Sequence, residues 1–326
     1  MMGCVAGSIA IDPALVARAK DALGLPDGER IGLAVSGGPD SMAMLLLAHA
    51  AIPGRFEVAT VNHGLRPEAA EECQLVVAAC RARDVPCEVL RVTVEDGNLQ
   101  AEARHARYGA LLFWAVRRGL GSIATAHHMD DQAETLLMRL NRGSGLMGLS
   151  SIRQLRLLDY ANKKVRLIRP FLAFRRSELA GLLEQEGVAV AYDPSNRDER
   201  FDRVRMRKAI AAADWLDVAA IANSAGHLGD AADAVAWAAM REFKENVREE
   251  KNGFRYTGSP RSAPRQIQLF VAARIFGQMN AHPRGGQLDQ LIAGLARGKG
   301  GNVGGVLVTL DGEEWVFQPE PARTST

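Results

Sequence analysis

The stretch 31-IGLAVSGGPDSMAMLLL-47 joins a short apolar run to a second apolar run with helical spacing, through two glycines, two serines and a carboxylate. Gly37 and Gly38 permit backbone conformations that direct successive amides to one point, and Pro39 suits the first position of a helix. The start of that helix would add a partial positive charge. The junction therefore predicts a strand, a loop that binds phosphate or pyrophosphate, and a helix.

The loop differs from the common nucleotide-binding loops. It has neither GxxxxGK[ST] nor GxGxxG, and it contains no lysine. The charge of a bound phosphate must then be met by amides, by a metal ion or by an arginine from elsewhere. Asp40 could help to hold Mg²⁺, because oxygen ligands suit a hard cation. A glycine turn that only connects strand and helix is the plainer alternative, but such a turn rarely needs both serines and the aspartate.

Residues 30–128 alternate short runs typical of strands with longer helical ones. Strands are predicted at 31–35, 56–61, 87–94 and 122–127, and helices at about 40–50, 67–83, 99–118 and 130–141. This alternation predicts an α/β fold, a doubly wound parallel sheet with helices on both faces. Ligands bind such sheets beyond the carboxyl ends of the strands, where the strand order reverses.

Unusual polar clusters follow three of the predicted strands. Besides the loop at 36–41, they are 62-NHGLRPE-68 and 127-HHMDDQAE-134. In the last cluster, His127, Asp130, Asp131 and Glu134 follow helical spacing, and like charges on one helix face repel. We therefore expect a cation between them, either Mg²⁺ or an ammonium group. The alternative is that Asp130 caps the helix and Glu134 stays solvated.

The rest of the chain suggests a second domain. A Gly-rich loop at 142–151, a strand pair around 165–172, a helix at 177–187 that opens with a capping serine, and a turn at 193–196 follow in order. From residue 209 the chain is Ala-rich and helical, and Asp311-Gly312 predicts a hairpin turn near its end. We place the boundary near residue 210, with domains at 1–210 and 211–326, the second one smaller and mainly helical.

Composition and charge narrow the function classes. The chain has no run of 18 apolar residues and its start does not resemble a signal peptide, so we expect a cytoplasmic protein without a membrane partner. Its four cysteines, Cys4, Cys73, Cys80 and Cys87, form no CxxC pair, which favours buried, inert thiols. Residues 139–208 carry 16 Lys and Arg against 8 Asp and Glu, which fits either a solvated surface or a polyanion such as RNA.

Two arginines recur beside a tyrosine in 98-NLQAEARHARYGALL-112. Arg104 and Arg107 could extend along apolar surface towards water, or bind a phosphate or carboxylate through paired donors. His63 and His105 each stand alone in the sequence and fit a hydrogen-bonding role better than that of a base.

Together, the segments SGGPDS, VNHGLRPE, AEARHARY, HHMDDQAETLLMRLNRGSG and DPSN resemble the tRNA(Ile)-lysidine synthases, a branch of the N-type ATP pyrophosphatases of the PP-loop superfamily. The resemblance covers roughly residues 30–208. SGGxDS marks the wider superfamily, whereas HxxDDQAET followed by RGSG points to this branch. Asn62 stands where the family often has Asp, and Val204 interrupts a pattern closer to RNRIR.

The resemblance implies an adenine nucleotide alpha hydrolase-like fold and a two-step reaction on the isoleucine tRNA with a CAU anticodon. ATP adenylates the wobble cytidine, and the ε-amine of L-lysine then displaces AMP to form lysidine. A homodimer is possible, and the second domain would bind tRNA. The resemblance and the loop chemistry together suggest these site residues: Ser36, Gly37, Gly38, Pro39, Asp40, Ser41, Asn62 and His63 for ATP; Asp40 and Asp130 for Mg²⁺; Arg107, Asp131 and Glu134 for lysine; and His127 with Asp130 near ATP or metal.

Three other functions remain open at this point. Another PP-loop enzyme would keep the adenylation and change the nucleophile, although sulfur insertion would favour reactive cysteines. A metal-dependent phosphohydrolase built on His127, Asp130 and Asp131 would turn over without tRNA or lysine. A nucleotide- or RNA-binding module without activity would tolerate the loss of Asp40.

Overall fold

A computed structural model describes residues 11–64, 68–93, 99–192, 198–258, 260–283 and 286–321. Its internal contacts divide the chain into two compact units, Met1–His227 and Leu228–Thr326. The division falls within helix α9 (Val218–Asn246), whereas the sequence suggests a boundary near residue 210.

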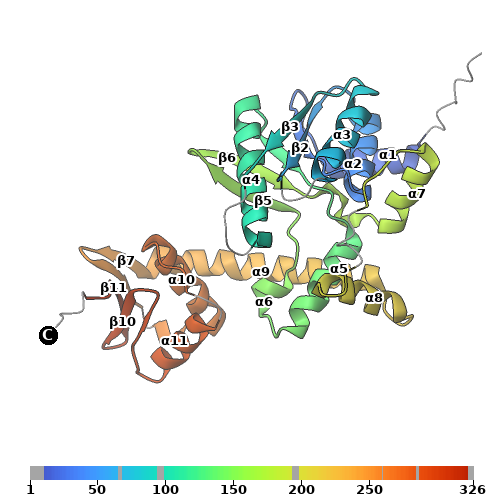
Figure 1. Cartoon of the computed structure of the whole chain (residues 1–326). Coiled ribbons are helices and arrows are strands. Elements are labelled where there is room, and N and C mark those ends of the chain that lie inside the picture. The colour runs from blue at the N-terminus through green and yellow to red at the C-terminus, as the bar shows by residue number, and fades with distance from the viewer. Residues whose placement is uncertain are drawn as a thin grey trace, which may run out of the picture. The chain divides into compact units, whose positions relative to one another are not determined.

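The first unit is built on a six-stranded sheet (Figure 1). The strand order is β3-β2-β1-β4-β6-β5, and every neighbouring pair is parallel except β5 and β6. The predicted parallel sheet is thus confirmed. Its strands are β1 (Ile31–Ala34), β2 (Phe56–Asn62), β3 (Cys87–Arg91), β4 (Ser122–Ala124), β5 (Leu155–Tyr160) and β6 (Lys163–Ile168).

Helices cover both faces of this sheet. The core on one face contains α2 residues from Met42 to Ala48, all of them buried, together with residues of α1, α3 and α7. The core on the other face is centred on Trp114 of α4, whose side chain is fully buried. The helices of this unit are α1 (Pro13–Leu23), α2 (Pro39–Ala51), α3 (Glu68–Arg81), α4 (Leu99–Arg118), α5 (Met129–Asn141), α6 (Leu146–Leu149), α7 (Arg176–Glu186) and α8 (Asp202–Ala212), and α9 begins here.

The strand order reverses at β1. Leu33 of β1 pairs with Val58 of β2 on one side and with Ala124 of β4 on the other. From β1 the chain builds outward through β2 and β3, and it then returns to add β4 on the opposite side. The loops after β1 and β4 therefore meet at the switch point where doubly wound sheets bind ligands.

Local details beyond β4 differ from the sequence prediction. The strand pair is β5 and β6, and Pro170–Ala173 form a 3₁₀ helix in place of a strand. Helix α7 has Arg175 rather than a serine at its N-cap, because the Glu178 carboxylate accepts the Arg175 amide hydrogen at 2.7 Å. The Gly-rich loop contains the short helix α6, and the predicted turn at 193–196 lies outside the described residues.

The second unit combines helices with a five-stranded antiparallel sheet of order β7-β8-β11-β10-β9. The predicted hairpin is confirmed: β10 and β11 pair from Val306 to Asp311, and Gly312 turns with a φ of 61°. Tyr256, Trp315 and Phe317 are fully buried against α10 and α11. Its elements are β7 (Val247–Glu250), β8 (Gly253–Tyr256), η3 (Pro260–Ser262), α10 (Arg265–Gln278), α11 (Gln287–Ala296), β9 (Gly301–Val303), β10 (Val306–Asp311) and β11 (Glu314–Pro319).

Two further observations concern the sequence predictions. Cys73 and Cys80 are buried, as predicted, and Cys87 is partly buried, whereas Cys4 lies outside the described residues. Across the described parts of the chain, no helix combines the length and apolar character needed to cross a lipid bilayer.

Candidate active site

The loop after β1 is closed by hydrogen bonds between its two serines. Ser41 Oγ accepts the Ser36 amide hydrogen at 3.1 Å and donates to the Gly38 carbonyl oxygen at 2.9 Å. Gly37 has a φ of 86°, and a β-carbon at Gly37 would lie 3.0 Å from the Glu72 carbonyl oxygen. Helix α2 begins at Pro39, and no described side chain caps its N-terminus. The first amides of α2 are therefore available to an anion, as a phosphate loop requires.

His128, which the sequence analysis did not single out, forms the N-cap of α5. Its Nδ1 accepts the Asp131 amide hydrogen at 3.3 Å, while the Asp131 carboxylate accepts the His128 amide hydrogen at 3.1 Å. The His128 side chain is fully buried, and its Nε2 lies 3.5 Å from an Asp40 oxygen. The loop after β1 and the loop after β4 therefore meet through this imidazole.

The pKa values of Asp40 and His128 are shifted by their proximity. Burial acts to raise the pKa of Asp40, but His128 and two nearby arginines outweigh burial and lower this pKa below its ordinary value of 3.8. Burial acts to lower the pKa of His128, but the carboxylates of Asp40 and Asp131 outweigh burial and raise it. Asp40 is thus ionised at neutral pH, as a metal or cation ligand must be.

Glu134 is enclosed by two arginines of α8. Its carboxylate accepts a hydrogen bond from Arg207 Nε at 2.7 Å and lies 3.1 Å from Arg203 Nε. The Glu134 side chain is only 2% exposed, which excludes the alternative in which it stays solvated. Arg203 also lies 3.8 Å from Asp131, so a guanidinium occupies the place where we expected a cation among these carboxylates.

Asp130 contacts the start of α7 rather than α8. Its carboxylate accepts the Arg176 amide hydrogen at 2.9 Å and lies 3.5 Å from Arg175 Nε. Asp130 therefore joins the start of α5 to the start of α7. His128, rather than Asp130, caps α5, which corrects the alternative considered from the sequence.

A cavity of about 410 Å³ lies at the carboxyl ends of β1 and β4. Nine of the predicted site residues line it, together with Tyr108, Arg176, Arg203 and Arg207. Four others do not line it: Gly37, Asn62, Asp130 and Glu134. The nine are Ser36, Gly38, Pro39, Asp40, Ser41, His63, Arg107, His127 and Asp131.

Two further lining residues have defined environments. Burial and nearby arginines, opposed by Asp131, lower the pKa of His127 to about 4, so its imidazole is neutral at neutral pH. His127 Nδ1 lies 3.0 Å from Thr125 Oγ1. The guanidinium carbon of Arg107 lies 5.5 Å from the centre of the Tyr108 ring, a cation–π distance that holds it at the cavity wall.

The loop after β2 contributes less. The Asn62 side chain accepts the Gly64 amide hydrogen at 2.9 Å, which shapes the turn after β2, and only His63 of this loop lines the cavity among the described residues. Residues 65–67 lie outside the described residues.

Known proteins match this chain over the domain that carries the cavity and over most of its length. A family model described as a PP-loop domain matches residues 12–213. The tRNA(Ile)-lysidine synthase of Novosphingobium aromaticivorans is 41% identical over 306 residues, which cover 92% of this chain and 91% of the relative. That of Zymomonas mobilis is 38% identical, with 93% and 92% covered. The chain belongs to the tRNA(Ile)-lysidine synthase family.

A solved structure supports the fold of this lysidine synthase family member. The U34-tRNA thiolase NcsA from Methanococcus maripaludis matches with a TM-score of 0.57, covering 67% of this chain and 78% of that chain at 16% identity. At that identity the likeness concerns the fold alone. The PP-loop domain that implies ATP use covers the whole six-stranded sheet and the loop after β1.

Three residues at the site of this lysidine synthase family member are not among those predicted from the sequence: His128, Arg203 and Arg207. Both arginines lie in the basic stretch of residues 139–208, whose charge fits either a solvated surface or a polyanion such as RNA. Their spacing of four residues, which places both on one face of α8, is a signal that they could act together on one partner. His128 gave a weaker signal, a histidine directly before the first turn of a predicted helix.

The magnesium prediction fits one carboxylate better than two. Among the described residues, no three His, Cys, Asp or Glu side chains are arranged to hold a metal ion. Mg²⁺ in nucleotide sites is commonly held by one or two carboxylates and the substrate phosphates. Asp40 has the ionised state and the position for this role, whereas the Asp130 carboxylate is engaged by the backbone of α7.

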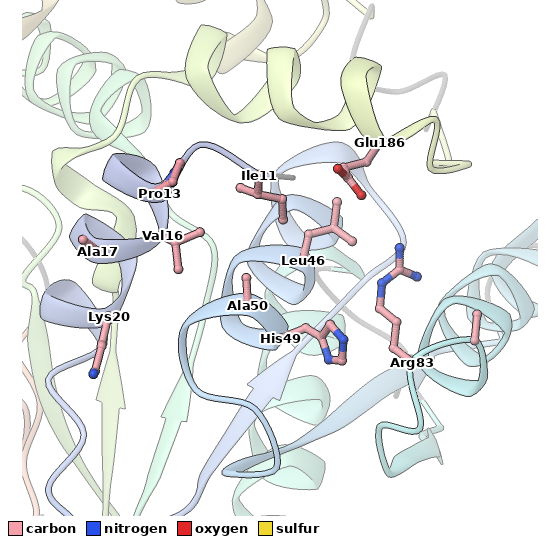
Figure 2. Close-up of a pocket in the computed structure, with 11 residues that line it drawn as sticks. Ile11, Pro13, Val16, Ala17, Lys20, Leu46, His49, Ala50, Arg83 and Glu186 are labelled. Atoms are coloured by element: carbon pink, nitrogen blue, oxygen red, sulfur yellow. The ribbon is translucent and has the colours of Figure 1, made fainter. Parts of the chain in front are cut away.

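A second, larger cavity of about 680 Å³ lies among the helices on the α2 face of the sheet (Figure 2). Its walls come from α1, α2, the residues just after α3 and the end of α7, and Figure 2 shows Leu46 between Val16 on one side and Arg83 and Glu186 on the other. None of the predicted site residues lines it. The two cavities share no lining residue.

Proposed function

We propose that this chain forms lysidine on the isoleucine tRNA with a CAU anticodon, using ATP and L-lysine. In the first step the carbonyl oxygen of the wobble cytidine attacks the α-phosphorus of ATP and pyrophosphate leaves. In the second step the ε-amine of lysine attacks the activated ring carbon and AMP leaves. One observation supports both steps: the phosphate loop and the residues suited to hold lysine line the same cavity.

The phosphate loop would hold the departing pyrophosphate. The free amides at the start of α2 and the partial charge of that helix stabilise negative charge as it develops. Arg176, which lines the same cavity, would supply the positive charge that the loop itself lacks. Asp40 would hold Mg²⁺ against the phosphates, and the ion would neutralise part of their charge when bound.

Lysine would be positioned by groups of opposite charge. We assign its ammonium end to Asp131 and its carboxylate to Arg107, because both line the cavity and Arg binds carboxylates through paired donors. Glu134 could contact lysine only if Arg203 and Arg207 moved. We therefore assign Glu134 a structural role, in which it holds α8 in place. Asp130 would support α5 and α7 in the same indirect way.

His127 would bind rather than transfer protons. An efficient general base has a pKa near the working pH, and a pKa of about 4 makes the His127 imidazole a weak base. A neutral imidazole in the cavity wall can still exchange hydrogen bonds with a nucleotide or a base. We therefore assign His127 to contacts with ATP or with the cytidine.

The tRNA would be held by exposed cations and by the C-terminal residues. Within the described residues, Arg156, Lys163 and Lys164 of the β5–β6 hairpin are exposed and form no ion pair. Such cations bind phosphates without reading sequence. We propose that residues 1–210 carry the chemistry and that residues 211–326 bind the tRNA. The anticodon loop, being single-stranded, presents the cytidine at low cost.

We further propose that the protein acts in the cytoplasm, where tRNA is found, and that it forms a homodimer, which sedimentation would detect.

The decisive experiment follows ¹⁴C-lysine into RNA. Purified protein is incubated with ATP, Mg²⁺ and lysine, together with either the isoleucine tRNA bearing CAU or the methionine tRNA with the same anticodon. Pyrophosphate release is measured in parallel, with and without lysine. Label is expected in the isoleucine tRNA and absent from the methionine tRNA.

Other results would select other functions. ATP turnover that needs neither RNA nor lysine would favour a phosphohydrolase. Pyrophosphate release that needs tRNA but incorporates no lysine would favour another PP-loop enzyme with a different nucleophile. Nucleotide or RNA binding that persists without turnover, and that survives Asp40→Asn, would indicate a binding module.

A further inference from the structure

The imidazole of His128 lies between the two halves of the cavity. Its Nε2 is 3.5 Å from Asp40 Oδ2, in the phosphate loop, and 3.6 Å from Asp131 Oδ2, at the start of α5. The His128 side chain is fully buried, and within the described residues Nε2 makes no hydrogen bond of good geometry. A buried polar atom without a partner costs free energy, so such an atom beside a cavity is a sign of function.

The tautomer of His128 follows from its cap. Because Nδ1 accepts the Asp131 amide hydrogen at 3.3 Å, the neutral ring carries its proton on Nε2, the atom that lies 3.5 Å from Asp40 and 3.6 Å from Asp131. One N–H is thus poised between Asp40 and Asp131 and is not fully committed to either. Hydrogen bonds at catalytic sites often shorten only when substrates bind.

We propose that His128 is a positioning residue that couples the ATP half of the site to the lysine half, by donating Nε2–H to the carboxylates of Asp40 and Asp131. This proposal rests on the proposed function, in which these two carboxylates serve ATP and lysine. When the phosphate loop binds its nucleotide, a shift of Asp40 changes how strongly the Nε2–H group of His128 can hydrogen-bond to Asp131. His128 touches neither substrate in this scheme and acts through the two aspartates.

The two ends of the ring can be separated by substitution. In His128→Asn the side-chain oxygen can take the place of Nδ1, and Asn is a favourable N-cap, so the helix start is kept and the Nε2 donor is lost. In His128→Gln the amide nitrogen can take the place of Nε2, while the cap is weakened. His128→Asn therefore keeps the helix cap and removes the positioning contribution, whereas His128→Gln keeps the positioning contribution and weakens the cap.

A control variant comes from the same helix. Gln132 is buried and bonds to the backbone of Ile152 at 2.8 and 3.1 Å, and it does not line the cavity. Gln132→Met should lower stability without a selective effect on lysine. It shows what a purely structural loss on α5 looks like.

The experiment measures three quantities for wild type and each variant: the melting temperature, the Kd of lysine by calorimetry with and without a non-hydrolysable ATP analogue, and the KM and kcat for lysine in lysidine formation. For His128→Asn we expect a near-normal melting temperature, a rise in the lysine KM by about 10- to 100-fold, from the loss of one charge-assisted hydrogen bond, and no effect of the nucleotide on the lysine Kd. For His128→Gln we expect a lower melting temperature with the nucleotide effect largely kept.

The opposite behaviour of the two His128 variants would overturn the proposal. If His128→Asn behaves as wild type while His128→Gln loses lysine binding in step with stability, His128 is only a helix cap. If His128→Asn loses ATP, tRNA and lysine use together, as Gln132→Met would, the positioning role also fails. If wild type itself adds no lysine to tRNA, the proposed function fails, which is a result distinct from either of these.

Discussion

Glu134→Gln is the change whose effect follows most directly from the structure. The Glu134 side chain is 2% exposed and holds Arg203 and Arg207, whose side chains are 44% and 30% exposed. Removing one partner of a fully buried ion pair costs about 3–5 kcal/mol. Because both arginines here can still reach water and Gln keeps one acceptor, we expect a smaller loss, about 2 kcal/mol, in the free energy that holds α8 on α5.

Hydrogen exchange detects this loss locally, which suits a chain of two units whose unfolding need not be two-state. A loss of about 2 kcal/mol should raise the exchange rate of the α8 amides roughly 30-fold, because each 1.4 kcal/mol is a factor of ten. A matched control is Glu29→Gln, whose carboxylate forms an exposed pair with Arg166 at 2.6 Å. Exposed pairs contribute about 0–1 kcal/mol, so the control should change exchange little. Equal exchange of α8 in the two variants would refute the argument that buried Glu134 places this helix.

Three further outcomes are expected. Gly37→Ala should raise the KM for ATP about tenfold, because its φ of 86° and the Glu72 carbonyl oxygen 3.0 Å from the new β-carbon force the loop open; an unchanged KM would contradict this. Gly32→Ala should destabilise the first unit by about 1–3 kcal/mol and lower the urea concentration at which that unit unfolds, because the new methyl group would overlap the buried Trp114 ring; an unchanged midpoint would contradict this. Burial lowers the pKa of His127 from 6.5 to about 4, so between these pH values the unfolded state binds a proton that the folded state does not. Stability should therefore rise with pH between about 4 and 6.5. His127→Gln should flatten that rise in urea titrations, and an unaltered slope would count against this explanation.

The first half of the fold is predictable from the sequence because the information for it is local. The helix predicted at 99–118 coincides with α4, and α2 starts at Pro39, the residue that the loop sequence favours as a first helical position. Apolar periodicity and residue chemistry act over a few residues, so they can be read along the chain. The alternation of strands and helices predicted ligand binding at the carboxyl ends of the strands, whereas the strand order that puts the switch point at β1 came from the structure.

The partners of the charged residues could not be predicted in the same way. Arg207 and Glu134 are 73 residues apart in the sequence, and Arg176 and Asp130 are 46 apart. From the sequence, both arginines of α8 belonged to a basic stretch suited to RNA, and Asp130 was one of four acids or bases at helical spacing. Charge patterns name the groups that need partners but do not identify those partners.

The sequence by itself predicted the parallel sheet, the glycine-serine loop between its first strand and the following helix, and the family to which the motifs point, because each depends on short segments whose conformation follows from their own residues. Only the tertiary structure decided which carboxylates face the cavity, that a guanidinium stands among them, and that His128 lies between Asp40 and Asp131. The physical reason is that a carboxylate or an imidazole acquires its role from the charges and the burial around it, and the fold brings those neighbours from distant parts of the chain.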